Sequence, residues 1–86
     1  MKTYRATPTA AQIAAGYFIL PRRLYLEWNN RFPFHEYDAE AFGVQYKRLR
    51  LDQNYRVRVR LKEHLVPGDA VYVDVVEPKS LIIGKL

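Results

Sequence analysis

Segment 44–61 alternates apolar and charged side chains with a period of two, the pattern of β-strands with one buried and one exposed face. A three-residue loop at 52–54 would pair Arg48 with Arg58 and keep the charged side chains on one face, whereas a two-residue loop would mix the faces. Asn54 suits the left-handed position of such a loop. The segment therefore predicts a β-hairpin with one face of arginines: Arg48, Arg50, Arg56, Arg58 and Arg60.

The opposite face of this hairpin is apolar and predicts a contribution to the core from Leu49, Leu51, Tyr55, Val57 and Val59. Tyr46 falls on the arginine face, where its ring would be free to stack on a base. Like charges that face each other across a sheet are unfavourable, so the arginines need acidic neighbours or an anionic partner. The candidate acidic neighbours are Glu36, Asp38 and Glu40.

The whole chain, 1–86, is expected to form a single domain, with a helical and loop part at 1–43 and a β-hairpin, short helix and second β-hairpin at 44–86. Thr9 and Gln12 form a capping box for a helix at 10–15, which Gly16 ends. The remaining expected elements are a short buried strand at 17–20, a helix at 22–31, a loop at 33–43, a short helix at 61–65 and strands at 70–76 and 81–83. This order predicts a mainly β fold with short helices (α+β), built as a small barrel or a rolled antiparallel sheet.

Composition favours a polyanionic partner and disfavours several other classes. The formal net charge is +5 and the pI is about 9.7, a balance typical of proteins that bind nucleic acid. The absence of cysteine fits a reducing cytoplasm, and no apolar run approaches the roughly 18 residues of a membrane span. His35 and His64 lack the spacing of metal ligands, and the four glycines are isolated. We therefore expect no catalytic residues, no metal and no cofactor.

The second half of the chain resembles the AbrB/MazE-type (swapped-hairpin) DNA-binding domain. Segment 51–59 occupies the place of its strand, turn and strand, 61–65 of its short helix, 67–73 of its turn and third strand, and 80–85 of its fourth strand. Arg60 stands where that family has proline. Leu20-Pro21 before a helix and Gly68-Asp69 before a late strand also resemble the B3-like DNA-binding barrel. Both families belong to the cradle-loop barrel group, and the resemblance implies a DNA-binding barrel.

The expected function is that of a non-enzymatic DNA-binding protein, a transcriptional regulator or architectural factor, with duplex DNA as the first ligand, RNA as the second, and a homodimer possible. One alternative is an RNA-binding ribonucleoprotein or ribosomal component. Another is a protein-interaction module such as an antitoxin or a viral accessory protein. The predicted contact residues are Arg48, Arg50, Arg56, Arg58, Arg60, Lys47, Gln53, Asn54, Arg22, Arg23 and Lys62.

Overall fold

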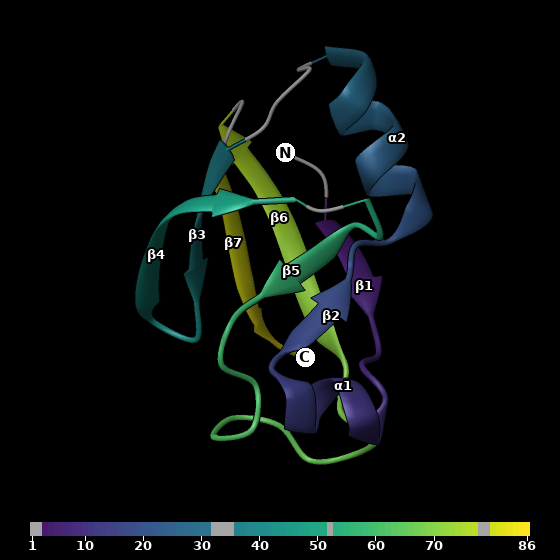
Figure 1. Cartoon of the computed structure of the whole chain (residues 1–86), viewed down its shortest axis with the longest axis vertical. Helices are drawn as coiled ribbons and strands as arrows, with labels where there is room; N and C mark the ends of the chain where they lie inside the picture. The colour runs from purple at the N-terminus through teal and green to yellow at the C-terminus, as the bar shows by residue number, and fades with distance from the viewer. Residues whose placement is uncertain (1–2, 32–35, 52, 78–79) are drawn as a thin grey trace.

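A computed structural model of the chain describes residues 3–31, 36–51, 53–77 and 80–86 (Figure 1). The elements are β1 (Thr3–Ala6), α1 (Ala10–Ala15), β2 (Tyr17–Ile19), α2 (Arg22–Arg31), β3 (Glu36–Ala41), β4 (Val44–Arg50), β5 (Arg56–Arg58), β6 (Val71–Glu77) and β7 (Ser80–Lys85). The predicted class, mainly β with two short helices at 10–15 and 22–31, is confirmed.

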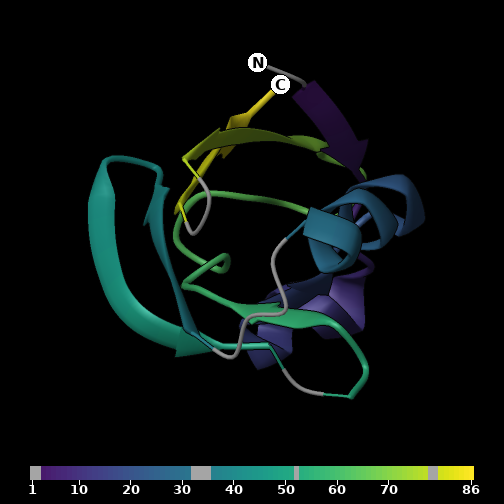
Figure 2. The same cartoon turned by 90° about the horizontal axis from the view of Figure 1, so that it is seen from above.

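The strands form two separate sheets. A five-stranded sheet has the order β1-β6-β7-β3-β4, and β2 pairs with β5 in a two-stranded sheet. Strands β3 and β7 run parallel, and the other neighbouring strands are antiparallel. Seen from above, the five-stranded sheet curves around two sides of the core, the β2–β5 pair lies across from it, and α2 occupies another side (Figure 2). The predicted small barrel is wrong, because the sheets do not close. The predicted rolled antiparallel sheet is also wrong, because the parallel β3–β7 pair makes the larger sheet mixed.

The core lies between the two sheets and takes alternate residues from their facing sides. Strand β2 contributes Phe18 and β5 contributes Val57, both with no exposed surface. The helices, the five-stranded sheet and the loops add the other members of the core cluster: Ile13, Leu20, Leu24, Tyr37, Ala39, Ala41, Val59, Leu61, Leu65, Val71, Val73, Leu81 and Ile83. Because every second residue of a strand points to the same face, this arrangement leaves one face of each sheet exposed.

The helix at 10–15 begins and ends as its sequence predicts. The Thr9 hydroxyl accepts a hydrogen bond from the Gln12 N–H, and the Gln12 side chain accepts one from the Thr9 N–H, both at 3.1 Å. Gly16 has a left-handed backbone (φ 81°), and its N–H donates to the Gln12 carbonyl oxygen. A capping box and a left-handed glycine are local signals, which is why this element is predicted correctly.

The predicted hairpin at 44–61 is wrong, and so is the described part of the predicted loop at 33–43. Residues 36–41 form β3, which pairs with β4 through a tight turn at Phe42 (φ 53°) and Gly43 (φ 81°). Two consecutive positive φ angles are the geometry of a type I′ hairpin turn. Strand β5 turns away from β4 and pairs with β2. Asp52, in the expected loop at 52–54, lies outside the described residues.

The predicted helix at 61–65 is only a single turn. The N–H groups of His64 and Leu65 both donate to the Leu61 carbonyl oxygen at 2.9 Å, and no further helical hydrogen bond follows them in this described segment. The expected strands at 70–76 and 81–83 are confirmed as β6, which lies one residue later than predicted, and β7, which is longer at both ends.

Asp69 stabilises the turn that precedes β6. Its Oδ2 accepts a hydrogen bond from the Val66 N–H (2.9 Å), and its own N–H donates to the Val66 carbonyl oxygen (3.0 Å). The Lys85 ammonium lies 3.4 Å from the same carboxylate oxygen. The Val66 hydrogen bond above all, together with Lys85, lowers the pKa of Asp69 below its ordinary value of 3.8, although partial burial acts in the opposite direction.

A carboxyl group whose pKa is lowered by folding contributes stability above its unfolded-state pKa, and this contribution is lost as the pH falls through the folded-state pKa. We therefore expect Asp69→Asn, which removes the charge and keeps an amide oxygen, to be less stable than the wild type at neutral pH. The difference should narrow as the pH falls below the ordinary value of 3.8. Urea unfolding across that pH range measures it, and a constant difference would contradict this assignment.

Candidate nucleic-acid interface

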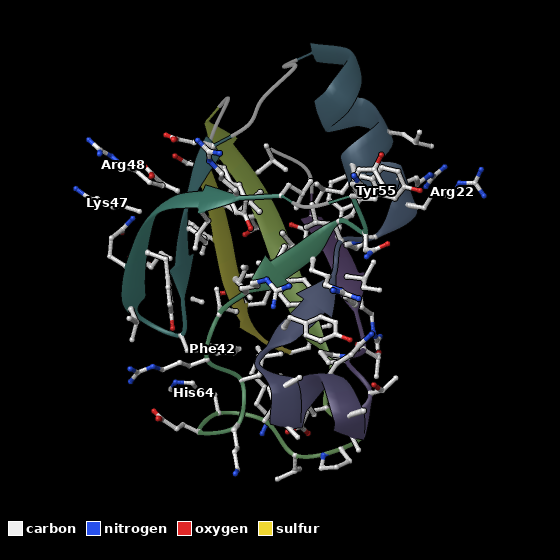
Figure 3. All side chains as sticks on the ribbon, in the orientation of Figure 1. Arg22, Phe42, Lys47, Arg48, Tyr55 and His64 are labelled. Atoms are coloured by element: carbon white, nitrogen blue, oxygen red, sulfur yellow. The ribbon has the colours of Figure 1, made fainter. Side chains whose placement is uncertain are left out.

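The predicted arginine face is divided between two sheets. Arg48 and Arg50 lie on β4, opposite β3, whereas Arg56 and Arg58 lie on β5, opposite β2. Figure 3 shows Lys47 and Arg48 projecting from one side of the molecule and Arg22 from the opposite side. No described arginine faces another arginine across either sheet, so the repulsion expected within a 44–61 hairpin does not arise.

A β-bulge sets the direction of the β4 side chains. Tyr37 pairs with Leu49 and Ala39 with Tyr46, so that Lys47 and Arg48 together face the single residue Asp38. Arg48 has a left-handed backbone (φ 56°), and its N–H donates to Asp38 Oδ1 at 3.1 Å. The extra residue shifts the alternation, so that Lys47 and Arg48 are both exposed while Tyr46 and Leu49 pack against the core.

Tyr46 therefore does not lie on an exposed arginine face, as the hairpin register had predicted. Its ring packs against the core, and its hydroxyl accepts a hydrogen bond from the Arg60 N–H at 3.1 Å. The sequence prediction failed here because a strict period of two does not allow for a bulge.

Acidic side chains balance part of the β4 charge, as the sequence suggested. Glu36 lies opposite Arg50 across the β3–β4 pair, and their side chains approach to 3.6 Å. Both side chains are largely exposed, at 47% and 76%, so this ion pair contributes little to stability. Arg60 similarly reaches Glu63 at 4.0 Å in the 61–65 turn, where Lys62 is exposed and His64 stacks on Phe42.

The β2–β5 pair presents a compact basic surface, which we call the ribbon face: Tyr17, Ile19, Arg56 and Arg58. Tyr17 pairs with Arg58 and Ile19 with Arg56, while Phe18 and Val57 point into the core. The guanidinium carbons of Arg56 and Arg58 lie 5.0 Å and 6.0 Å from the centre of the Tyr17 ring, within cation–π range. The two arginines thus share one aromatic ring on the outer side of the ribbon, where Arg58 is exposed and Arg56 is half-buried, with its Nε buried.

The first turn of α2 adds further positive charge at the end of the ribbon. The Leu20 N–H donates to the Tyr55 carbonyl oxygen at 3.0 Å, and the Tyr25 and Tyr55 rings stack at 3.9 Å. These contacts attach α2, with its exposed Arg22 and Arg23, to the segment that leads into β5.

Gln53 and Asn54 are exposed in the turn just before this segment. The left-handed backbone expected at Asn54 falls instead on Tyr55 (φ 58°). Asparagine usually occupies such a left-handed position. Here the stacking of Tyr55 on Tyr25 of α2 stabilises the left-handed backbone at Tyr55 instead.

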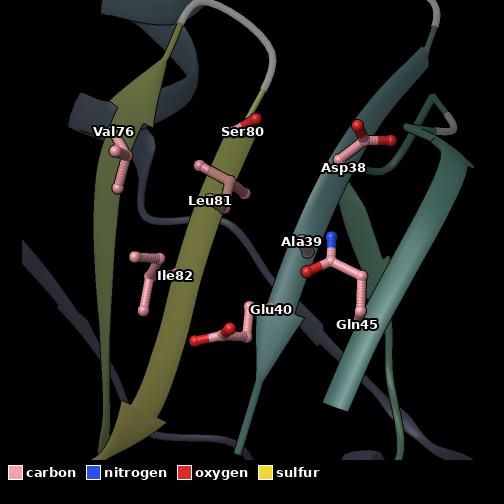
Figure 4. A pocket seen from close by; sticks show the side chains of 8 residues that line it. All are labelled: Asp38, Ala39, Glu40, Gln45, Val76, Ser80, Leu81 and Ile82. Atoms are coloured by element: carbon pink, nitrogen blue, oxygen red, sulfur yellow. The ribbon is translucent and has the colours of Figure 1, made fainter. Parts of the chain in front are cut away.

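Carboxylates gather away from the ribbon face. Asp38, Glu40 and Asp74 alternate with buried residues on β3 and β6, so they lie on the outer face of the five-stranded sheet. Figure 4 shows a shallow pocket on this face, with Asp38, Glu40 and Gln45 beside Val76, Ser80 and Ile82. These carboxylates would repel phosphate at this part of the outer face.

Sequence reasoning identified Arg56 and Arg58 but missed Tyr17. The strand at 17–20 was expected to be buried, although alternation would have placed Tyr17 and Ile19 on the face opposite Phe18. No local sequence pattern predicts that 17–19 pairs with 56–58, and this pairing is what brings Tyr17 close to Arg56 and Arg58.

Over 3–31, 36–51, 53–77 and 80–86, no group of three or more histidine, aspartate or glutamate side chains is arranged to hold a metal ion. In the same part of the chain, no helix has the length and apolar character needed to cross a membrane.

Comparisons of the chain with protein-family models, with curated proteins and with solved structures found no match.

Proposed function

We propose that this chain is a non-enzymatic nucleic-acid-binding protein, a transcriptional regulator or architectural factor, that binds duplex DNA through the ribbon face and the first turn of α2. The observation that supports this most is the wholly basic charge of the ribbon strands. Arg56 and Arg58 project from a two-stranded ribbon that contains no acidic residue, whereas the larger sheet carries Asp38, Glu40 and Asp74 as well as basic residues, so that its charges offset one another. A polyanion would therefore favour the ribbon over the larger sheet.

The shape of the β2–β5 pair suits the major groove of B-form DNA. That groove is about 12 Å wide and admits a two-stranded β-ribbon. Arginine binds guanine edges and phosphates with its N–H donors, and the exposed Ile19 (44%) can contact a thymine methyl group. Arg22 and Arg23, at the end of the ribbon, would bind flanking phosphates.

Duplex DNA is favoured over RNA for two reasons. A-form RNA has a deep, narrow major groove that side chains do not read. Proteins that bind single-stranded RNA stack bases on free aromatic rings, but Tyr46 packs on the core and the Tyr17 ring already contacts two guanidinium groups. A ribonucleoprotein role would gain support only from preferential binding of RNA.

The B3-like resemblance belongs to the same proposal. Strand β2 followed by Pro21 and α2 supports it, and so does the Gly68-Asp69 turn before β6. The AbrB/MazE-type resemblance is less well supported, because it needs strands that pair with each other at 51–59, and β5 pairs with β2 instead.

The salt dependence of binding tests this proposal. If Arg22, Arg23, Arg56 and Arg58 each displace one counterion from the duplex, log Kd should depend on log salt concentration with a slope of about 4 in magnitude. Fluorescence anisotropy with a labelled duplex, a single strand and an RNA hairpin between about 50 and 200 mM salt would measure it. A flat salt response, or no binding of duplex DNA at low salt, would count decisively against the proposal.

A further inference from the structure

We infer that Tyr17 is a positioning residue that holds Arg56 and Arg58 as a fixed pair, and that this pair reads two guanines along one stretch of the major groove. The inference rests on the proposed function, because it concerns how the ribbon face distinguishes one duplex from another. It adds a sequence preference, and a residue that sets it, to an interface that could otherwise bind any DNA.

The geometry of the β2–β5 pair brings two guanidinium groups within cation–π range of one ring. Tyr17 lies directly opposite Arg58 in the register, and Arg56 lies opposite Ile19, two pairs along. The guanidinium carbons of Arg56 and Arg58 are 5.0 Å and 6.0 Å from the ring centre. The backbone beneath them is anchored, because Phe18 and Val57 face each other with no exposed surface.

A guanidinium group that stacks on an aromatic ring keeps its N–H donors at its edge. Guanine presents two acceptors, O6 and N7, in the major groove, and arginine binds both of them at once. An arginine that is already held by a ring loses less side-chain freedom on binding than a free one. Tyr17 thus favours a directional contact with a base over a diffuse contact with phosphate.

The spacing along β5 sets the distance between the two guanines. Residues two apart on a strand are separated by about 6.6 Å, and base pairs rise by about 3.4 Å each. Arg56 and Arg58 therefore match two bases on one strand that are separated by one other base, when the ribbon lies along the groove. The expected ligand class is a duplex with a guanine, any base, and a guanine in succession.

Selection from a randomised duplex pool, followed by affinity measurements, tests this inference. The wild type should enrich duplexes with this guanine spacing, and replacing either guanine should weaken binding by about 5-fold to 150-fold. Tyr17→Leu should reduce this discrimination several-fold, whereas Tyr17→Phe, which keeps the ring, should retain it. The matched control is Tyr72→Leu, since Tyr72 is a partly buried tyrosine that packs over Gly84 on the other sheet; it should leave the discrimination unchanged.

A second pair of variants tests the guanine preference even if Tyr17→Leu does not fold. Arg56→Lys and Arg58→Lys keep the charge but remove the two-pronged contact, so each should lose its guanine preference while the salt slope stays the same. If the wild type binds duplex DNA without a guanine preference, or if folded Tyr17→Leu discriminates as well as the wild type, the inference is overturned and the proposed function stands. If the wild type binds no duplex, both are overturned.

Discussion

Reversing both ribbon arginines, Arg56→Glu and Arg58→Glu, should weaken duplex DNA binding at least about 100-fold at moderate salt. The two substitutions remove two cationic contacts and place two carboxylates where phosphates or guanine acceptors would lie. They also lower the formal net charge from +5 to +1, which reduces long-range attraction. Fluorescence anisotropy would give the affinity, and circular dichroism would show whether the variant is folded. An affinity within about threefold of the wild type would place the interface elsewhere.

A charge-matched pair separates contact from overall charge. Arg58→Glu and Arg5→Glu change the net charge by the same amount, but Arg5 lies on β1, exposed on the outer face of the five-stranded sheet and opposite Tyr72. Because salt screens charges beyond roughly 8–10 Å, we expect Arg5→Glu to have a small effect and Arg58→Glu a large one. Equal effects would mean that binding depends on net charge alone.

Replacing Phe18 by alanine should remove a large part of the stability of the fold. Phe18 has no exposed surface and lies opposite Val57, at the point where the β2–β5 pair meets the core. Truncation of a buried phenylalanine costs about 3–5 kcal/mol, out of about 4–13 kcal/mol for a domain of this length. Urea unfolding followed by circular dichroism would measure the loss.

The neighbouring Ile19 provides the control for Phe18. Ile19 is on the same strand but points outward, with 44% of its surface exposed. Ile19→Ala should change the free energy of unfolding by no more than about 0.5 kcal/mol. A similar loss for both variants would contradict the assignment of β2 as a strand with one buried and one exposed face.

Local signals in the sequence predicted local structure well. The capping box at Thr9 and the stop at Gly16 each involve groups a few residues apart, so the sequence alone determines the ends of α1. The alternation at 56–60 also predicted correctly which side chains are buried: Val57 and Val59 are, whereas Arg58 and Arg60 are exposed. Periodicity determines which face of a strand is buried and does not determine its partner.

Strand pairing is where sequence reasoning failed. Strand β5 has a choice between β4, close in the chain, and β2, almost forty residues earlier, and it pairs with β2. Strand β3 was taken for a loop because Glu36, Asp38 and Glu40 are acidic, although they alternate with the buried Tyr37, Ala39 and Ala41. The turn at Phe42 and Gly43 carries no asparagine to mark a hairpin. The shared site of Tyr17, Arg56 and Arg58 depends on these non-local pairings.

The central position of β7 in the larger sheet imposes an order on folding during synthesis. Strand β7 lies between β6 and β3, and β1 pairs only with β6, some seventy residues later in the chain. Strand β1 and one edge of β3 therefore stay unpaired until 71–85 has left the ribosome, whereas the β3–β4 hairpin can form earlier. Contacts so distant in sequence are slow to form, and strand edges left open during that interval are exposed to aggregation. Protection of these two edges during synthesis thus depends on how soon segment 71–85 emerges.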